Sequence, residues 1–316
     1  MSPPTKVVLI TGANAGLGYE SARQLASKDG VEKVLLACRN PEKAQAAKKS
    51  LEESTGKDGD FYEVVVMDVS SLDSVRKAVD SLSSAVAIDG LILNAGGGGG
   101  SNPAELTTDG VTAIFGANVL GHVLLVDLLL KNKKLSSGGS VVLAGSEASR
   151  GIPSLGMPAP VLKDGSVEEL TAIADGSRFA EKEKTFDGMY SITKLVATLW
   201  MSSMARKEPS FRFVTMSPGM TAGTNVADHV PAMLRFLYKR VFFPLFQLLG
   251  KAHGVDSGAK RYVDALLDGD TYKTGIFYAS KVGATGEVGD QAIFSDVFTK
   301  EDYQDNAYTT VHKFIK

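Results

Sequence analysis

Short runs of branched apolar residues alternate with longer mixed segments through the first two thirds of the chain. The apolar runs cover residues 7–11, 33–38, 61–67, 89–93, 139–144 and 211–216. They are rich in Val, Ile and Leu at consecutive positions, which is typical of strands buried on both faces. The segments expected to be helical lie between them, at about 19–29, 41–55, 71–84, 107–132 and 189–207. This alternation predicts an α/β fold with a Rossmann-like, doubly wound parallel sheet covered by helices.

The length and composition suit one large globular domain or two small ones. The chain has 316 residues, of which 44% are apolar, so it is long enough to form a substantial core. A formal net charge of −2 gives no reason to expect nucleic acid as a partner. Because Cys38 is the single cysteine, an intrachain disulfide and a cysteine-rich metal site are both excluded. The four histidines are too scattered to form a metal-binding motif, so we expect no metal.

Neither a secretion signal nor a membrane span is predicted. Residues 1–6 lack the apolar core of a signal peptide. No window contains the roughly eighteen apolar residues that a membrane span requires. We therefore expect a protein that is soluble or bound peripherally to a membrane.

The first apolar run leads directly into a glycine-rich turn with the spacing Gly-x3-Gly-x-Gly. A strand, such a turn and a helix in this order predict a phosphate cradle, because backbone N–H groups and the positive end of the helix dipole face one anion. Glycine-rich turns also occur without a ligand, so the turn alone leaves both interpretations open. The residues expected to contact a dinucleotide here are Gly12, Asn14, Ala15, Gly16, Leu17 and Gly18.

The end of the second strand bears on the choice of cofactor. About twenty residues after the glycines, nucleotide-binding folds often have an acidic residue that binds the ribose hydroxyls. This chain has Cys38, Arg39 and Asn40 there instead. A guanidinium favours a 2′-phosphate, with which it forms bidentate hydrogen bonds. Arg39 and Asn40 therefore predict NADP(H), with Asn14 as a further polar contact beside the phosphate. The alternative is a solvated arginine at the start of the next helix.

Two further strand ends offer cofactor contacts. Asp68 and Val69 follow the third strand, where the carboxylate could accept a hydrogen bond from an adenine amino group. The alternative is that Asp68 caps the next helix. The fourth strand ends in Asn94, Ala95 and Gly96, and a run of glycines follows. A backbone this bare allows a cofactor to lie against it.

Candidates for catalysis come from the second half of the sheet. Asn118 lies inside an apolar segment, where it either kinks a helix and positions a water molecule or packs against neighbouring backbone. Ser146 follows the fifth strand. Tyr190 and Lys194 are four residues apart and share one helix face, so we expect the ammonium to lower the tyrosine pKa. A surface pair without a function is the alternative.

The sixth strand leads into a turn that could hold a nicotinamide amide. Its residues are Pro218, Gly219 and Thr221. Together and in this order, the motifs resemble the short-chain dehydrogenase/reductase family over roughly residues 5–225. The resemblance rests on TGANAGLG, NAG at 94–96, Asn118, Ser146, Tyr190-x3-Lys194 and Pro218-Gly219-x-Thr221.

The resemblance implies a single Rossmann-like domain that binds NAD(P)(H). It also implies a role for each residue of the catalytic set. Tyr190 would be the general acid/base, and Lys194 would bind the nicotinamide ribose and lower the tyrosine pKa. Ser146 would polarise the substrate carbonyl, and Asn118 would hold a proton-relay water.

Within the family, the chain resembles the branch of retinol dehydrogenases and light-dependent protochlorophyllide reductases. The light-driven enzymes carry a cysteine two residues after the motif lysine, where this chain has Val196, and a threonine in place of Ser146. These departures favour hydride transfer in the dark between NADP(H) and the carbonyl or alcohol of a bulky lipophilic substrate. A light-dependent C=C reductase of a tetrapyrrole is the alternative. A non-catalytic NADP(H)-binding sensor or scaffold is a third hypothesis.

Two segments are expected to determine specificity within the single domain. Residues 147–189 form a long polar insertion before the catalytic tyrosine, and such insertions are usually lids or surface loops. Residues 226–252 are apolar and basic, which fits the wall of a large hydrophobic pocket, a membrane-surface helix, a subunit contact or an ordinary core helix. The first interpretation suggests a substrate such as an isoprenoid, steroid, retinoid or tetrapyrrole.

The C-terminal part is expected to extend the sheet. A strand is predicted at 274–278, followed by a glycine-rich loop and a short acidic helix at 300–305. The resemblance implies a monomer or a homo-oligomer. It also implies a cytoplasmic location, or the plastid stroma if a transit peptide has been removed.

Overall fold

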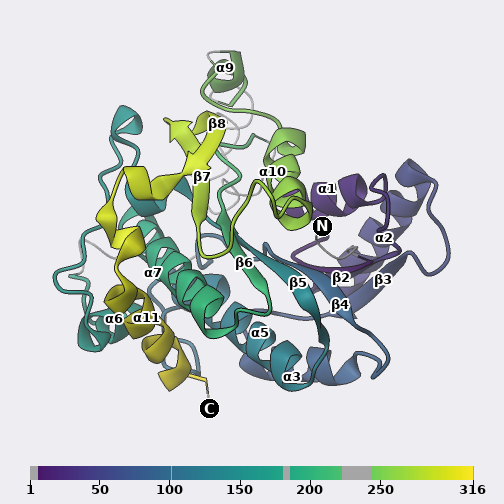
Figure 1. The fold of residues 1–316 in the computed structure, drawn as a ribbon, viewed down its shortest axis with the longest axis horizontal. Coiled ribbons are helices and arrows are strands. Elements are labelled where there is room, and N and C mark those ends of the chain that lie inside the picture. Colours follow the sequence, from purple (N-terminus) through teal and green to yellow (C-terminus); the bar gives the residue numbers. More distant parts are fainter. Residues whose placement is uncertain (1–5, 101, 181–185, 223–242, 249, 316) are drawn as a thin grey trace.

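The computed structural model describes residues 6–100, 102–180, 186–222, 243–248 and 250–315. Their centre is an eight-stranded sheet with the order β3-β2-β1-β4-β5-β6-β7-β8 (Figure 1). The strands are β1 (Val7–Thr11), β2 (Lys33–Cys38), β3 (Tyr62–Val66), β4 (Ile88–Leu93), β5 (Leu135–Ala144), β6 (Arg212–Met216), β7 (Phe277–Val282) and β8 (Thr285–Asp290). All neighbours pair in parallel except β7 and β8, so this is the doubly wound sheet that the apolar runs predict.

The strand order reverses next to β1, which pairs with β2 on one side and β4 on the other. In sheets of this kind, ligands bind beyond the carboxyl ends of the strands at such a reversal. Thr11, Cys38, Leu93, Ala144 and Met216 end their strands at this edge. Residues predicted to contact the cofactor and substrate follow each of them.

Helices cover both faces of the sheet (Figure 1). They are α1 (Gly16–Leu25), α2 (Pro41–Thr55), α3 (Leu72–Ser81), α4 (Ala113–Phe115), α5 (Gly121–Lys131), α6 (Val167–Ala174), α7 (Phe186–Lys207), α9 (Phe243–Leu248), α10 (Val255–Leu267) and α11 (Glu301–Lys313). A π-helical segment, Gly116–Leu120, joins α4 to α5. The predicted helix at 41–55 matches α2, because Asn40 caps its start and Gly56, with φ 67°, ends it.

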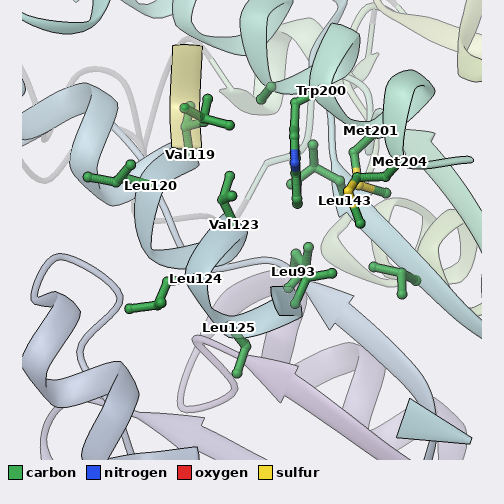
Figure 2. Close-up of a cluster of buried hydrophobic side chains, with 14 of the residues drawn as sticks. Leu93, Val119, Leu120, Val123, Leu124, Leu125, Leu143, Trp200, Met201 and Met204 are labelled. Atoms are coloured by element: carbon green, nitrogen blue, oxygen red, sulfur yellow. The ribbon is translucent and has the colours of Figure 1, made fainter. Parts of the chain in front are cut away.

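Two cores form because successive strand residues point to opposite faces of the sheet. Val8 and Ile10 of β1 belong to the core that includes α1, α2 and α10, whereas Leu9 belongs to the core with α3, α5 and α7. In the latter core, Trp200, Met201 and Met204 of α7 face Leu143 of β5 (Figure 2). This packing fixes α7, which carries the catalytic candidates Tyr190 and Lys194, against the sheet.

One helix corrects the expectation that no segment is long and apolar enough to cross a membrane. Residues Ala113–Lys131 meet that test by length and composition, with a mean hydropathy of 2.0. In the fold, 72% of this window is buried inside the protein. The segment is therefore a core helix that packs against one face of the sheet.

The C-terminal third departs most from the predicted elements. The strand expected from Thr274 begins at Phe277, because Gly275 has a φ of 78° that a regular strand does not accommodate. Residues 285–290, expected in a glycine-rich loop, form β8 and pair with β7 across a tight turn at Gly283. The helices α6 and α10 were not predicted, and the acidic helix continues to Lys313 as α11.

Candidate active site

The three glycines of the first turn meet three different steric demands. Gly12 has a φ of 69°, and a Cβ there would lie 3.1 Å from Ala95 Cα. At Gly18 a Cβ would lie 2.4 Å from the carbonyl oxygen of Gly12, so α1 can approach the turn only without a side chain. Gly16 also has a positive φ, 56°, but a Cβ there would meet nothing within 4 Å. The turn is thus closed at Gly12 and Gly18 and open at Gly16, as a phosphate cradle requires.

The end of β4 holds this turn in place. Asn94 Nδ2 donates to Thr11 O at 2.9 Å, and the backbone N–H of Ala95 donates to Thr11 Oγ1 at 2.9 Å. Thr11 Oγ1 also lies 3.2 Å from Nε2 of the buried His122. Asn94 and Ala95 therefore stabilise the glycine turn through hydrogen bonds to Thr11, which precedes it. Thr11 and His122 were not among the predicted site residues, because no sequence motif links them.

The predicted adenosine end lies beside the turn. Burial raises the pKa of the Cys38 thiol to about 11. The backbone N–H of Gly12 donates to Ala37 O at 2.8 Å. The glycine turn therefore rests on the end of β2. Arg39 follows, and its side chain is exposed to solvent, so it is free to reach a ligand beside the turn.

Asn40, Asp68 and Val69 were predicted as cofactor contacts, and two of them have structural duties as well. Asn40 Oδ1 accepts from the N–H of Lys43 at 2.8 Å and so caps α2. Asp68 Oδ1 accepts from the N–H of Ser70 at 2.9 Å, whereas Ser71 is the residue that caps α3. Asp68 thus forms the turn before the cap. Val69 is buried beside it.

Asn118 is fully buried in the π-helical segment between α4 and α5. Its Nδ2 donates to the carbonyl oxygens of Gly97 and Ile114, both at 2.8 Å, and its Oδ1 accepts from the N–H of Gly97 at 3.1 Å. The structure shows the packing against neighbouring backbone that one expectation describes and the departure from α geometry that belongs to the other. Gly96 permits this approach, because a Cβ there would lie 2.6 Å from Asn118 Oδ1.

Ser146, Tyr190 and Lys194 come together at the carboxyl end of β5. The side chains of Ser146 and Tyr190 are hydrogen-bonded. Lys194 Nζ donates to Ala144 O at 2.9 Å and lies 5.8 Å from the centroid of the Tyr190 ring. Because Lys194 is buried and Tyr190 is half-buried, the pair is part of the fold and the surface-pair alternative is wrong.

The predicted direction of the tyrosine pKa shift is wrong for this arrangement. Burial raises the pKa of Tyr190 above its usual value, and the nearby charge of Glu147 raises it further, while the hydrogen bond to Ser146 opposes both. Burial lowers the pKa of Lys194 to about 8. The Lys194 ammonium donates to the carbonyl oxygen of Ala144. The desolvation of Tyr190 raises the tyrosine pKa by more than the ammonium lowers it.

The turn after β6 is held from the C-terminal part of the chain. Thr221 Oγ1 donates to Gly219 O at 3.1 Å, and His253 Nε2 donates to Pro218 O at 2.6 Å. At Gly219, with φ 75°, a Cβ would lie 2.8 Å from Ala284 O and 2.9 Å from an Arg261 nitrogen. His253 and Arg261 are thus supporting residues that the sequence motifs did not reveal.

The two segments expected to determine specificity are described unequally. Residues 147–189 contain α6 and two short 3-10 turns, Glu147–Arg150 and Pro153–Leu155. Much of 226–252 lies outside the described residues. Its part in α9 exposes Leu245 and Leu248, the latter at 84% of its surface, so this portion is not an ordinary core helix.

Comparison with known proteins agrees with this geometry. Residues 6–159 match the family model described as short chain dehydrogenase. Protochlorophyllide reductase A, chloroplastic, from Oryza sativa subsp. japonica is 31% identical over 289 residues, covering 86% of this chain and 72% of its own. The chain therefore belongs to the short-chain dehydrogenase/reductase family, and it is an oxidoreductase of that family.

Solved structures share the fold at lower identity. Salutaridine reductase from Papaver somniferum matches 87% of this chain and 100% of its own with a TM-score of 0.64 and 18% identity. L-Sorbose reductase from Gluconobacter frateurii, in complex with NADPH and L-sorbose, matches 90% and 98% with a TM-score of 0.64 and 19% identity. The single-sheet architecture is thus that of known short-chain dehydrogenases.

Proposed function

We propose that this protein transfers hydride between NADP(H) and the carbonyl or alcohol of a bulky lipophilic substrate. The observation that carries the proposal is the cluster of Ser146, Tyr190 and Lys194 at the carboxyl edge of the sheet. It lies just after β5 and on α7, between the open glycine turn after β1 and the Pro218–Thr221 turn after β6. This order suits a dinucleotide that lies across the strand ends.

The residues present fit such a cofactor. The open space at Gly16 and the start of α1 suit a pyrophosphate, and exposed Arg39 suits a 2′-phosphate with Asn14 beside it. We assign the other cofactor contacts to residues at the neighbouring strand ends: Gly12, Ala15, Leu17, Gly18, Asn40, Asp68, Val69, Asn94, Ala95, Gly96, Tyr190, Lys194, Pro218, Gly219 and Thr221. When bound, the nicotinamide supplies or accepts the hydride.

The chain's own residues move the proton. In reduction, the Tyr190 hydroxyl donates its proton to the carbonyl oxygen as the hydride arrives at carbon, and the Ser146 hydroxyl donates a hydrogen bond to the same oxygen. A raised tyrosine pKa keeps this proton in place at neutral pH. Lys194, protonated for the most part below pH 8, stabilises the negative charge that develops on Tyr190. Asn118 holds the backbone at Gly97 and is assigned a water on the proton path.

A second candidate reaction is supported by the curated relatives. The rice protein of 31% identity is a protochlorophyllide reductase, which favours C=C reduction of a tetrapyrrole. Val196 and Ser146 stand where light-driven enzymes carry cysteine and threonine, and this difference supports the dark reaction. Exposed Leu245 and Leu248 of α9 support a lipophilic substrate for either reaction, and peripheral contact with a membrane.

The names of the relatives bear on the location of the protein. The rice protein is described as chloroplastic, which is consistent with a plastid location, and a cytoplasmic one is equally compatible with the fold. We propose a protein that acts as a monomer or a homo-oligomer, without nucleic acid.

A substrate screen separates the candidate functions. NADPH oxidation is followed with lipophilic aldehydes, ketones and porphyrins, in darkness and under illumination, for the wild type and Tyr190→Phe. Dark reduction of a carbonyl compound that the variant cannot catalyse supports the main proposal. Reduction of a tetrapyrrole only in light supports the second candidate. NADPH binding without turnover of any class contradicts both and supports a sensor or scaffold.

A further inference from the structure

A buried ion pair lies directly behind the catalytic serine. Glu147 follows Ser146 in the chain, and its Oε1 is 3.6 Å from an Arg261 nitrogen of α10. Their side chains are only 4% and 9% exposed. Burying two charges is costly, and an apolar pair of similar volume often gives equal stability. A reason other than stability is therefore worth seeking.

Both charges are fully engaged by hydrogen bonds. Glu147 Oε1 accepts from the N–H of Ser280 at 3.1 Å and from its Oγ at 2.9 Å, and Oε2 accepts from Ser217 Oγ. Arg261 donates to Ser217 O at 3.3 Å, to Ser280 Oγ at 3.1 Å and to Gly286 O at 2.9 Å. The pair thus contacts Ser217 through both its side chain and its backbone.

These contacts join the two sides of the proposed reaction site. Ser146 and Glu147 belong to the segment after β5, which would polarise the substrate carbonyl. Ser217 begins the turn after β6, and its Oγ also accepts from the N–H of Gly219 at 3.2 Å. Arg261 lies against that turn, since a Cβ on Gly219 would come within 2.9 Å of its guanidinium. The carboxylate and the guanidinium therefore tie the serine segment to the turn assigned to the nicotinamide.

We propose that Glu147 and Arg261 are positioning residues that fix the separation between Ser146 and the Pro218–Gly219 turn during hydride transfer. The inference rests on the function proposed above and adds two residues to it. Neither side chain contacts the reacting atoms. They act through Ser217, Ser280 and the backbone of the segments that they join.

The carboxylate of the pair also has a spectroscopic consequence at Tyr190. Ser146 is hydrogen-bonded to the Tyr190 phenol, Lys194 Nζ lies 5.8 Å from its ring centroid, and the Glu147 carboxylate and the Tyr262 phenol interact with it electrostatically. The Glu147 charge raises the pKa of Tyr190. Removing that charge should let Tyr190 ionise at lower pH, which is measured as phenolate absorbance after subtraction of the Tyr190→Phe spectrum.

The test replaces the pair by apolar residues in Glu147→Leu/Arg261→Met. Because both charges go together, no unpaired charge is left, but the buried groups of Ser217 and Ser280 lose their partners. We therefore expect a lower melting temperature and compare the proteins at a temperature at which both are folded. We expect kcat for a carbonyl compound found in the screen to fall about 100-fold, as for a reacting group displaced by about 1 Å. NADPH should bind more weakly, and Tyr190 should titrate at lower pH. Wild-type kcat, NADPH affinity and titration in a folded double variant would overturn the inference.

A milder variant keeps the test decisive if the double variant does not fold. Ser217→Ala leaves the ion pair intact and removes the hydroxyl between the carboxylate and the turn. We expect about tenfold lower kcat and weaker NADPH binding, in keeping with the loss of a hydrogen bond to a charged group. Unchanged values in this variant would also count against the inference.

The matched control is Asp305→Asn, which weakens the contact of Asp305 with Arg206 and Ser203 at the far end of α7. Ser203 is about 20 Å along the helix from Tyr190 at 1.5 Å per residue. This variant should lose stability but keep kcat and the Tyr190 titration. If the wild type reduces no carbonyl compound, the proposed function fails, and the positioning role is then judged on NADPH affinity and the titration alone.

Discussion

The two ends of the proposed cofactor site differ in how completely the protein satisfies its own polar groups. At the nicotinamide end, Ser146, Tyr190 and Lys194 bond to one another or to backbone, and burial shifts the pKa values of Tyr190 and Lys194. At the adenosine end, Arg39 is exposed and has no hydrogen-bond or ion-pair partner among the described residues. The comparison suggests that the catalytic geometry is built into the fold, whereas the choice of cofactor depends on one side chain that only a ligand would engage.

The largest effect is expected from Tyr190→Phe, at the buried end. Without the hydroxyl the proton donor is lost, so we expect kcat to fall by about 100- to 10,000-fold, the usual contribution of a positioned acid. NADPH affinity should change little, because the ring remains. Stopped-flow single turnover and fluorescence titration measure the two quantities. Tyr272→Phe, whose ring packs against Tyr278 of β7, is the control and should behave as the wild type.

Burying the ammonium of Lys194 should make the folded protein less stable at neutral pH. Its pKa falls from 10.5 to about 8 on folding, so between these values the unfolded chain binds more protons. Stability should therefore rise with pH in that window, by about 3 kcal/mol in total. Lys194→Met has no such charge, and we expect it to be about 2 kcal/mol more stable than the wild type at pH 7 after loss of the bond to Ala144.

Denaturant unfolding of both proteins from pH 7 to pH 10.5 measures this difference. The advantage of Lys194→Met should shrink as pH rises through 8, while its hydride transfer stays absent at every pH. If the wild type is more stable than Lys194→Met at pH 7, the buried ammonium of Lys194 does not destabilise the folded protein.

How much of this site the sequence predicts depends on whether a residue's partner is local. The glycine turn, Asn40 and the Tyr190–Lys194 pair are short-range patterns, so their positions were predictable. Even α6 had a local signal, since Ser166 and Glu169 form a Ser-x-x-Glu capping pattern. Arg261 and Ser280 contact Glu147 but lie more than 100 residues away along the chain, so no local sequence pattern predicts these contacts. The pKa of Tyr190 was mispredicted for the same reason, because burial is a property of the whole fold.

At the exposed end, Arg39→Asp should reverse the cofactor preference. A charged hydrogen bond contributes about 1.5–3 kcal/mol, so NADPH affinity should fall about 10- to 100-fold while NADH affinity is kept or improved. The matched control is Lys49→Asp on α2, an exposed site with the same change of charge. An unchanged NADPH-to-NADH ratio in Arg39→Asp would contradict the assignment of the 2′-phosphate to this residue.

The smallest effect tests whether Asn40 serves the fold or the ligand. Its Oδ1 caps α2, so we expect the backbone of Asn40 to make the cofactor contact assigned to it. Asn40→Ala should then lose about 1 kcal/mol of stability with little change in NADPH affinity. Asn40→Asp keeps the cap, and we expect it to retain stability while weakening NADPH several-fold by repulsion of the 2′-phosphate. If Asn40→Ala instead weakens NADPH strongly at unchanged stability, the amide is a ligand contact, and the adenosine end is recognised by two side chains. The difference in NADPH affinity and stability between Asn40→Ala and Asn40→Asp therefore decides whether Arg39 is the one side chain that recognises the 2′-phosphate. If it is, cofactor choice depends on a single exposed residue, whereas the catalytic residues are held by the fold.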